Sequence, residues 1–353
     1  MNDTLTQSPP RHEKNSVELK RLLPIFKLKR KASNNIEKSP GPFWTMVNKE
    51  ISDHVRSWRF IILIFIFTLT CAGSLISGLT NMDEAVKAND PAGTFFFLKL
   101  FTISDGSLPS FIVFISFLGP LLGISLGFDA INSEQNKGTL SRLMAQPIYR
   151  DSIMIAKFIA ALTVIGVMFF ALGFLVMGLG LIQLGIPPTA EEFWRIVFFI
   201  LLSVLYVAFW LNLSMVFSVR FRQAATSAMA GIAVWLFFTV FYGLIVNVIA
   251  KATAPSQFSA PHIFYKYQEF VSSLLWITPS QLFSDATTTL LMPSVRSLSP
   301  LTMEQVYGAI PSPLPLGQSI LLVWPQLTGL IAITTVCFAL AYLSFMRREI
   351  RSR

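Results

Sequence analysis

Six long apolar runs constrain this chain more than any other feature of its sequence. Each run can cross the hydrocarbon of a bilayer as a helix, which takes about 20 residues, and a backbone inside lipid must satisfy its own hydrogen bonds. Only 13% of the residues are charged and the mean hydropathy is +0.59, whereas roughly a quarter of the residues of soluble domains are charged. We therefore predict an all-α integral membrane protein with six transmembrane helices, at 60–79, 111–128, 153–182, 196–219, 226–250 and 320–345.

The distribution of basic residues predicts how these spans are oriented. An even number of spans puts both ends of the chain on one side, and 22 of the 28 Lys and Arg residues fall on that side. By the positive-inside rule, both termini and the central loop 129–157 are predicted to be cytosolic. The net charge of +9 is thus a topological signal, and no nucleic-acid partner is expected.

The residues before the first span divide into two segments. Residues 1–42 are polar, basic and rich in proline, which predicts a disordered cytosolic tail. The basic cluster at 27–31 either binds anionic lipid or is only a topology signal in a solvated tail. Residues 43–59 predict an amphipathic interfacial elbow helix or, alternatively, an extension of the first span. The apolar stripe of this segment consists of Trp44, Val47, Ile51, Val55 and Trp58.

The central loop 129–157 is polar but carries the elements of an ordered structure. Gly138 can end a first helical turn, Thr139 can cap a second helix, and Pro147 stops that helix. Leu140, Leu143 and Met144 share one face of this second helix, which indicates a docking surface. Lys157, in the first turns of the next span, is expected to extend its ammonium toward the headgroups.

This loop resembles that of the ABC-2 type permeases, the membrane subunits of ATP-binding-cassette transporters. The resemblance rests on Glu134, on the Gly-Thr-Leu sequence from Gly138 to Leu140, on Pro147, on Arg150 and on Lys157, all between the second and third spans. Ala156 stands where this family usually has glycine, and Gln135 where a basic residue is common. The branch that it resembles holds the nitrous-oxide-reductase maturation, sodium-efflux and gliding-motility permeases.

The resemblance implies a role and a set of partners. Residues 60–353 would be the permease domain in a bacterial plasma or inner membrane. A separate ATPase, present twice, would bind ATP and Mg²⁺ and contact loop 129–157, and a second permease copy, identical or related, would complete the transporter. Export is the usual direction in this family. In the loop, Leu140, Leu143 and Met144 would supply the apolar contact, Glu134 and Arg150 the polar contacts, and Gly138 the backbone break.

Three glycines in the second span indicate close helix packing. Gly119, Gly123 and Gly127 are spaced four apart, so they form one strip from which side chains are missing. Another helix can approach such a strip closely. The partner is either a helix of the same chain or the second subunit, and the sequence leaves this choice open.

Residues 251–319 form the longest segment between spans. Helical spacing from Phe264 to Leu275, followed by a second short stretch at 280–291, predicts two short external helices. They would act as a gate or bind an extracytoplasmic partner, or else form an interfacial amphipathic hairpin with no gating role. The alternative function that we keep is a non-transporting membrane scaffold, which anchors an ATPase and transmits force or recruits a partner through this segment.

Motifs of other classes are missing from the sequence. There is no G-x-x-x-x-G-K-[ST] phosphate loop and no H-E-x-x-H, and the two cysteines and three histidines have no metal-site spacing. We therefore expect no enzyme activity, no cofactor and no metal in this chain. No Asp or Glu lies in the middle of a span, which argues against an ion-coupled carrier.

Overall fold

The computed structural model describes residues 41–80, 95–102, 109–145, 149–185, 187–255, 260–294 and 313–348. Helices and short connections make up all of this part of the chain, and it contains no β-strand. The predicted tail 1–42 lies outside the described residues except for its last two positions. Residues from Gly41 onward belong to one compact unit.

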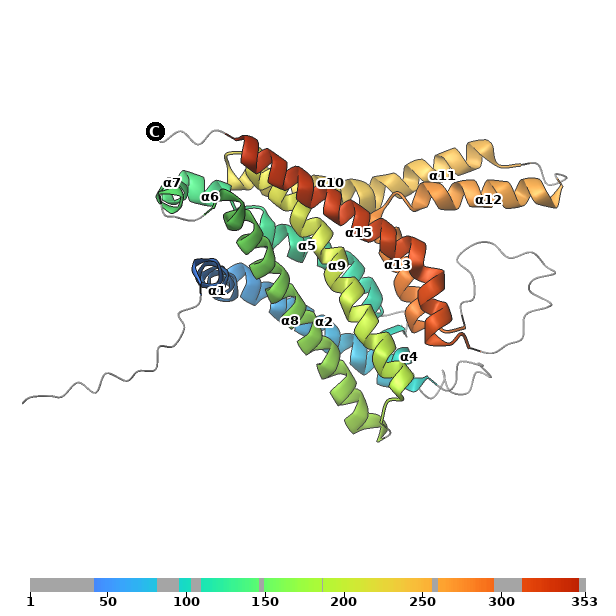
Figure 1. The fold of residues 1–353 in the computed structure, drawn as a ribbon. Coiled ribbons are helices and arrows are strands. Elements are labelled where there is room, and N and C mark those ends of the chain that lie inside the picture. Colours follow the sequence, from blue (N-terminus) through green and yellow to red (C-terminus); the bar gives the residue numbers. More distant parts are fainter. Residues whose placement is uncertain are drawn as a thin grey trace, which may run out of the picture. The chain divides into compact units, whose positions relative to one another are not determined.

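Six helices of this unit are long and apolar enough to span a membrane, which confirms the predicted fold class. They are α2 (Trp58–Thr80), α5 (Phe111–Gly127), α8 (Arg150–Leu184), α9 (Ala190–Arg220), the run from α10 (Ala224–Leu236) through η1 (Phe237–Phe241) to α11 (Tyr242–Thr253), and α15 (Leu316–Arg347) (Figure 1). Five of these helices extend beyond the predicted spans, and α5 ends one residue before the predicted position 128. The helix α9 begins six residues before the predicted position 196, because Thr189 and Glu192 form a capping box that stabilises a polar first turn.

The helix α9 lies at the centre of the bundle and packs against α5, α8, α10 and α15 (Figure 1). Its contact with α5 is made along the predicted glycine strip. A Cβ atom on Gly123 would lie 2.7 Å from the carbonyl oxygen of Val207, and one on Gly127 would lie 2.8 Å from that of Leu211. Glycine is therefore needed for the two backbones to approach, and the neighbour of the strip is a helix of the same chain.

The predicted elbow is a helix, but it is shorter than the sequence indicated. The helix α1 (Pro42–Val55) packs against α8 and buries Met46, Val47 and Glu50. The backbone turns at Arg56 and Ser57, and Trp58 is already the first residue of α2. Ser57 makes this turn favourable because its hydroxyl accepts from the backbone N–H of Phe60, which would otherwise lack a helical partner. Trp58 therefore belongs to the first span and not to the elbow.

Shorter helices lie at the end of the bundle opposite to loop 129–157. They are α4 (Phe96–Thr102), α12 (Pro261–Leu275) and α13 (Pro279–Leu291). The last two are the short helices expected in segment 251–319. The helix α12 runs beside α11 (Figure 1), and the hydroxyls of Tyr242 and Tyr267 donate to carbonyls on the opposite helix at 2.7 and 2.8 Å.

Arg195 of α9 joins these segments, and it is fully buried. Its guanidinium pairs with Glu191 at 2.9 Å, donates to the carbonyl oxygen of Leu290 at 2.8 Å and contacts the hydroxyl of Ser319 at 3.2 Å. It also donates to the carbonyl oxygen of Leu314. One cation therefore connects the end of α13 to the start of α15. No local sequence pattern distinguishes Arg195 from a basic residue that only sets the topology.

Candidate functional site

The loop between α5 and α8 forms two short helices with a sharp break between them. They are α6 (Asn132–Asn136) and α7 (Thr139–Met144), and the break is at Gly138, whose φ of 67° is left-handed. Glycine adopts this conformation without the steric penalty of a side chain. Thr139 is the first residue of α7 instead of its cap, and its hydroxyl donates to the carbonyl oxygen of Glu134 at 3.2 Å. Pro147 lies outside the described residues.

Hydrogen bonds with the end of α9 and with the segment that follows it hold this loop in place. The hydroxyl of Ser218 accepts from the backbone N–H groups of Ile131 at 3.0 Å and Asn132 at 3.3 Å. The side-chain amide of Asn136 donates to the carbonyl oxygen of Arg222 at 2.9 Å. Because α9 is the central helix, the loop is attached directly to the core of the bundle.

A buried ion cluster connects the loop to α1 and α8. The ammonium of Lys157, on α8, lies 2.7 Å from Oε1 of Glu134 on α6 and 2.9 Å from Oε2 of Glu50 on α1. The three side chains are only 5%, 12% and 8% exposed, in that order. The expectation that Lys157 extends toward headgroups is therefore wrong, because two carboxylates hold its ammonium inside the protein. Sequence reasoning missed Glu50 altogether.

The cluster sets the protonation state of Glu50. Burial by itself would raise the pKa of the Glu50 carboxyl, but the charges and hydrogen bonds of Lys157 and Lys49 more than offset this effect. The result is a pKa below the ordinary value, so Glu50 is ionised at neutral pH. A charged lysine shared by two carboxylates thus joins three segments that are far apart in sequence.

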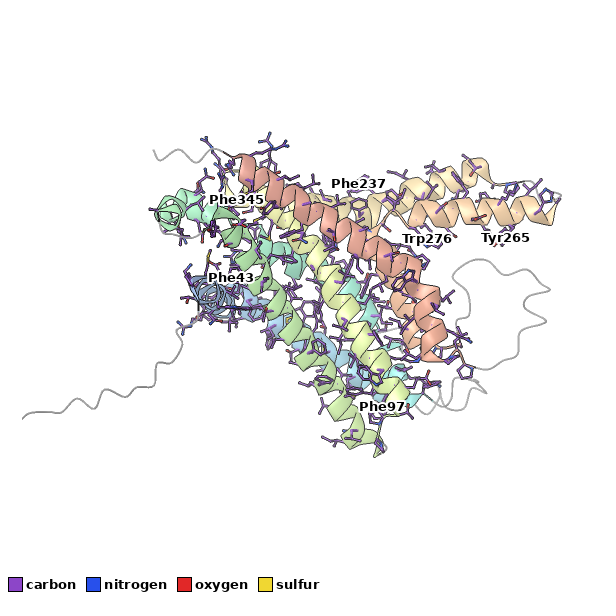
Figure 2. The ribbon with its side chains drawn as sticks, viewed as in Figure 1. Phe43, Phe97, Phe237, Tyr265, Trp276 and Phe345 are labelled. Carbon is purple, nitrogen blue, oxygen red and sulfur yellow. The ribbon has the colours of Figure 1, made fainter. Side chains whose placement is uncertain are left out.

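Arg150 connects the start of α8 to the end of the last span. Its Nη2 atom donates to the backbone carbonyl oxygens of Phe345 and Arg348. The guanidinium also lies over the ring of Phe345, labelled in Figure 2, at 5.0 Å from the centroid. The resemblance implied that Arg150 contacts an ATPase. This contact stays a prediction. In the structure the guanidinium donates at the C-terminal end of α15, where the carbonyl of Phe345 also accepts from the backbone N–H of Arg348.

One of the three apolar residues of α7 does not lie on the exposed face that the spacing indicated. Leu140 is only 2% exposed and packs in the core of this chain, so its side chain presents no surface to a partner. Leu143 is half-buried against the same core. The side chain of Met144 lies outside what the structure describes. The exposed positions of the loop include Lys137 and Tyr149, and Tyr149 is 82% exposed.

A cavity of about 560 Å³ opens between α1, the end of α5 and the two loop helices. Charged and hydroxyl groups line it, together with Leu126, Ala130 and Leu143. Arg59 and Asp129 pair at 2.6 Å on its wall. Burial lowers the pKa of His54, another lining residue, so this imidazole is neutral near pH 7. Among the described residues, no group of three His, Cys, Asp or Glu side chains could hold a metal ion.

Comparisons with known proteins agree with the sequence resemblance. Two curated relatives are each called "Probable ABC transporter permease protein NosY". The chain is 25% identical to the protein from Stutzerimonas stutzeri over 58% of its own length and 68% of the relative. It is 24% identical to the protein from Pseudomonas aeruginosa over 58% of its own length and 70% of the relative. The sequence model that describes the ABC-2 family transporter proteins matches residues 44–350. This chain therefore belongs to the ABC-2 family of transporter proteins, as a multi-pass protein of the cell membrane.

Proposed function

We propose that this chain is the permease of an ABC exporter that is driven by a separate ATPase docked on loop 129–157. ATP and Mg²⁺ are bound by that ATPase, and two ATPases work with two permease copies. Membership of the ABC-2 family and the names of the curated relatives support a membrane subunit of an ABC transporter. The lack of acidic residues in the middle of the spans favours a hydrophobic or amphipathic cargo over a free ion.

The buried ion cluster of Lys157, Glu134 and Glu50 is the observation that supports coupling between the ATPase and the membrane helices. A docked ATPase that displaces α6 also displaces Glu134, whose partner Lys157 belongs to α8 and whose neighbour Glu50 belongs to α1. Separating buried charges costs several kcal/mol, so the three helices move together instead of breaking the cluster. Movement of the loop is thereby passed to a span that packs against α9, the centre of the bundle.

The surface of contact in this proposal differs from the one that the sequence suggested. Leu140 supports the loop from inside, and Arg150 holds the loop to α15. The described loop residues that face outward include Lys137, the partly exposed Leu143 and Tyr149. We assign the polar contact with the ATPase to Lys137 and the apolar contact to Leu143 and Tyr149.

Co-purification with the candidate ABC ATPase tests this docking surface. The detergent-solubilised wild type is compared with a Lys137→Glu, Tyr149→Asp double variant, in which both changes are at exposed positions. We expect the wild type to retain the ATPase and the double variant to lose it. Trp194→Asp is the matched control, because this exposed aromatic lies near the start of α9, at the opposite end of the bundle. If the double variant retains the ATPase as well as the control does, the assigned surface is wrong.

The scaffold function stays a second candidate because of one observation on α12. This helix is not among the six candidate spans, yet it exposes the large apolar side chains of Ile263, Phe264, Tyr265 and Phe270. A Phe264→Ser, Phe270→Ser variant separates the two functions. A scaffold loses its external partner and keeps ATPase binding, whereas a transporter without such a partner keeps ATP-dependent transport in reconstituted vesicles.

A further inference from the structure

Four arginines gather where α9 and α15 end, and we call them the arginine corner: Arg220, Arg222, Arg347 and Arg348. The guanidinium of Arg348 donates to the carbonyl oxygen of Val219, so the two helix ends are in direct contact. Burial lowers the pKa of Arg348, and repulsion by Arg222 and Arg220 lowers it further. Arg348 is therefore close enough to Arg222 and Arg220 for their charges to repel.

The positive charge of this corner is not neutralised by the described part of the chain. Lys49, Arg59, Lys157 and Arg195 each form a salt bridge with a carboxylate. None of the four corner arginines has such a partner among the described residues. Two helix C-termini contribute about half a negative charge each, so within the described residues the four arginines keep a net positive charge of roughly three. Arg220, Arg222 and Arg347 are also exposed, so an external anion can reach them.

An apolar surface continues from the corner along the last span. Leu340, Leu343 and Met346 are exposed on α15, within two turns of Arg347. Because α15 is long and apolar enough to cross the membrane, these side chains face hydrocarbon or another membrane-embedded surface. The corner therefore places cations at the edge of a span and apolar side chains directly beneath them.

We propose that the arginine corner binds an anionic phospholipid, with its phosphate on the guanidinium groups and an acyl chain along Leu340 and Leu343. Guanidinium groups bind phosphate oxygens through charge-assisted hydrogen bonds, and basic clusters beside a span attract anionic lipid. An acidic surface of a soluble partner would satisfy the arginines but could not cover the apolar side chains within the span. A lipid satisfies both, and it holds the ends of α9 and α15 together.

Binding of phosphatidylglycerol to the full chain in detergent, followed by native mass spectrometry, tests this site. An Arg220→Gln, Arg222→Gln variant is compared with a Lys251→Gln, Lys266→Gln control, which removes the same charge from exposed positions near the other end of the chain's fifth span and on α12. A basic residue beside a membrane contributes about 1 kcal/mol, so we expect binding to weaken roughly 20- to 30-fold in the corner variant. We expect no change in the control. Phosphatidylcholine with the same chains should bind weakly to every variant.

Three outcomes would overturn the proposal. If phosphatidylglycerol binds equally weakly to the corner variant and to the control, only the net charge of the protein matters. Competition by free glycerol 3-phosphate at the affinity of the lipid would assign the corner to a soluble phosphate compound. Unchanged binding in the corner variant would exclude the site. Should Arg220→Gln impair folding, the exposed pair Arg222→Gln, Arg347→Gln gives the same comparison. The experiment contains no ATPase, so its result is independent of the docking proposal.

Discussion

Replacing Lys157 by methionine removes the cation that two buried carboxylates share. Methionine preserves most of the volume of the lysine stem, so the change is mainly electrostatic. Glu50 and Glu134, with side chains 8% and 12% exposed, would be left as unpaired charges, because methionine ends one atom short of the ammonium that lies 2.9 and 2.7 Å from their oxygens. Removing one member of a buried ion pair typically destabilises a protein by about 3–5 kcal/mol. We expect a loss in this range for Lys157→Met.

Equilibrium unfolding in mixed micelles, followed by tryptophan fluorescence, measures this loss. Asp53→Asn is the matched control, because Asp53 pairs with Lys49 at 3.4 Å but the two side chains are 62% and 56% exposed. Exposed pairs contribute roughly 0–1 kcal/mol, so the control should be nearly neutral. Changing Glu50 and Glu134 to glutamine together with Lys157→Met should restore most of the stability, since no unpaired charge then stays buried.

If Lys157→Met lowers the free energy of unfolding no more than Asp53→Asn does, the buried cluster does not stabilise the protein through its charge. Water would then reach the cluster, and the link between α1, α6 and α8 would be too weak to transmit movement. A second outcome would also contradict the prediction: a large loss of stability in Lys157→Met that is not recovered when Glu50 and Glu134 are changed to glutamine as well. It would show that Lys157 acts through packing and not through its charge.

Three further predictions concern single residues. Gly123→Ala should destabilise the chain by about 1–3 kcal/mol in the same assay, because its Cβ would meet the α9 backbone at Val207, whereas Gly166→Ala, with open space around it, should be neutral or stabilising. Gly138→Ala should cost roughly 1–2 kcal/mol through its left-handed φ of 67° and weaken ATPase co-purification. The folded-state pKa of Glu50 is lowered, so its contribution to stability is present above its ordinary pKa of 4.5 and is lost as the pH falls through the folded value. Unfolding measured from pH 6 to pH 3 should show this loss, and Glu50→Gln should reduce it.

The features that the sequence could predict are those with a local signal. The six spans follow from the length of their apolar runs, and the break at Gly138 follows from one glycine between two short helical patterns. The burial of Leu140 could not be predicted this way. Helical spacing shows which side chains share a face, but it does not show whether that face meets a partner or the core of the same chain.

The ion cluster and the Arg150 contact lacked any local signal. Lys157 and Glu50 are 107 residues apart in sequence, and Arg150 and the carbonyl of Arg348 are 198 apart. A charged residue near the end of a span ordinarily extends into the headgroups, so the sequence favoured solvation for Lys157. Only the tertiary packing of α1 against α8 brings Glu50 close enough to overturn that preference.

The capping of α15 by Arg150 also has a consequence for biosynthesis. Both acceptors, the carbonyls of Phe345 and Arg348, lie at the end of the sixth span. During translation the loop emerges long before this span, so its anchor at Arg150 can form only after the sixth helix has been made and inserted. A ribosome stalled earlier leaves the loop without that anchor, and such an unfinished chain differs from the mature protein in the very region proposed to recruit the ATPase.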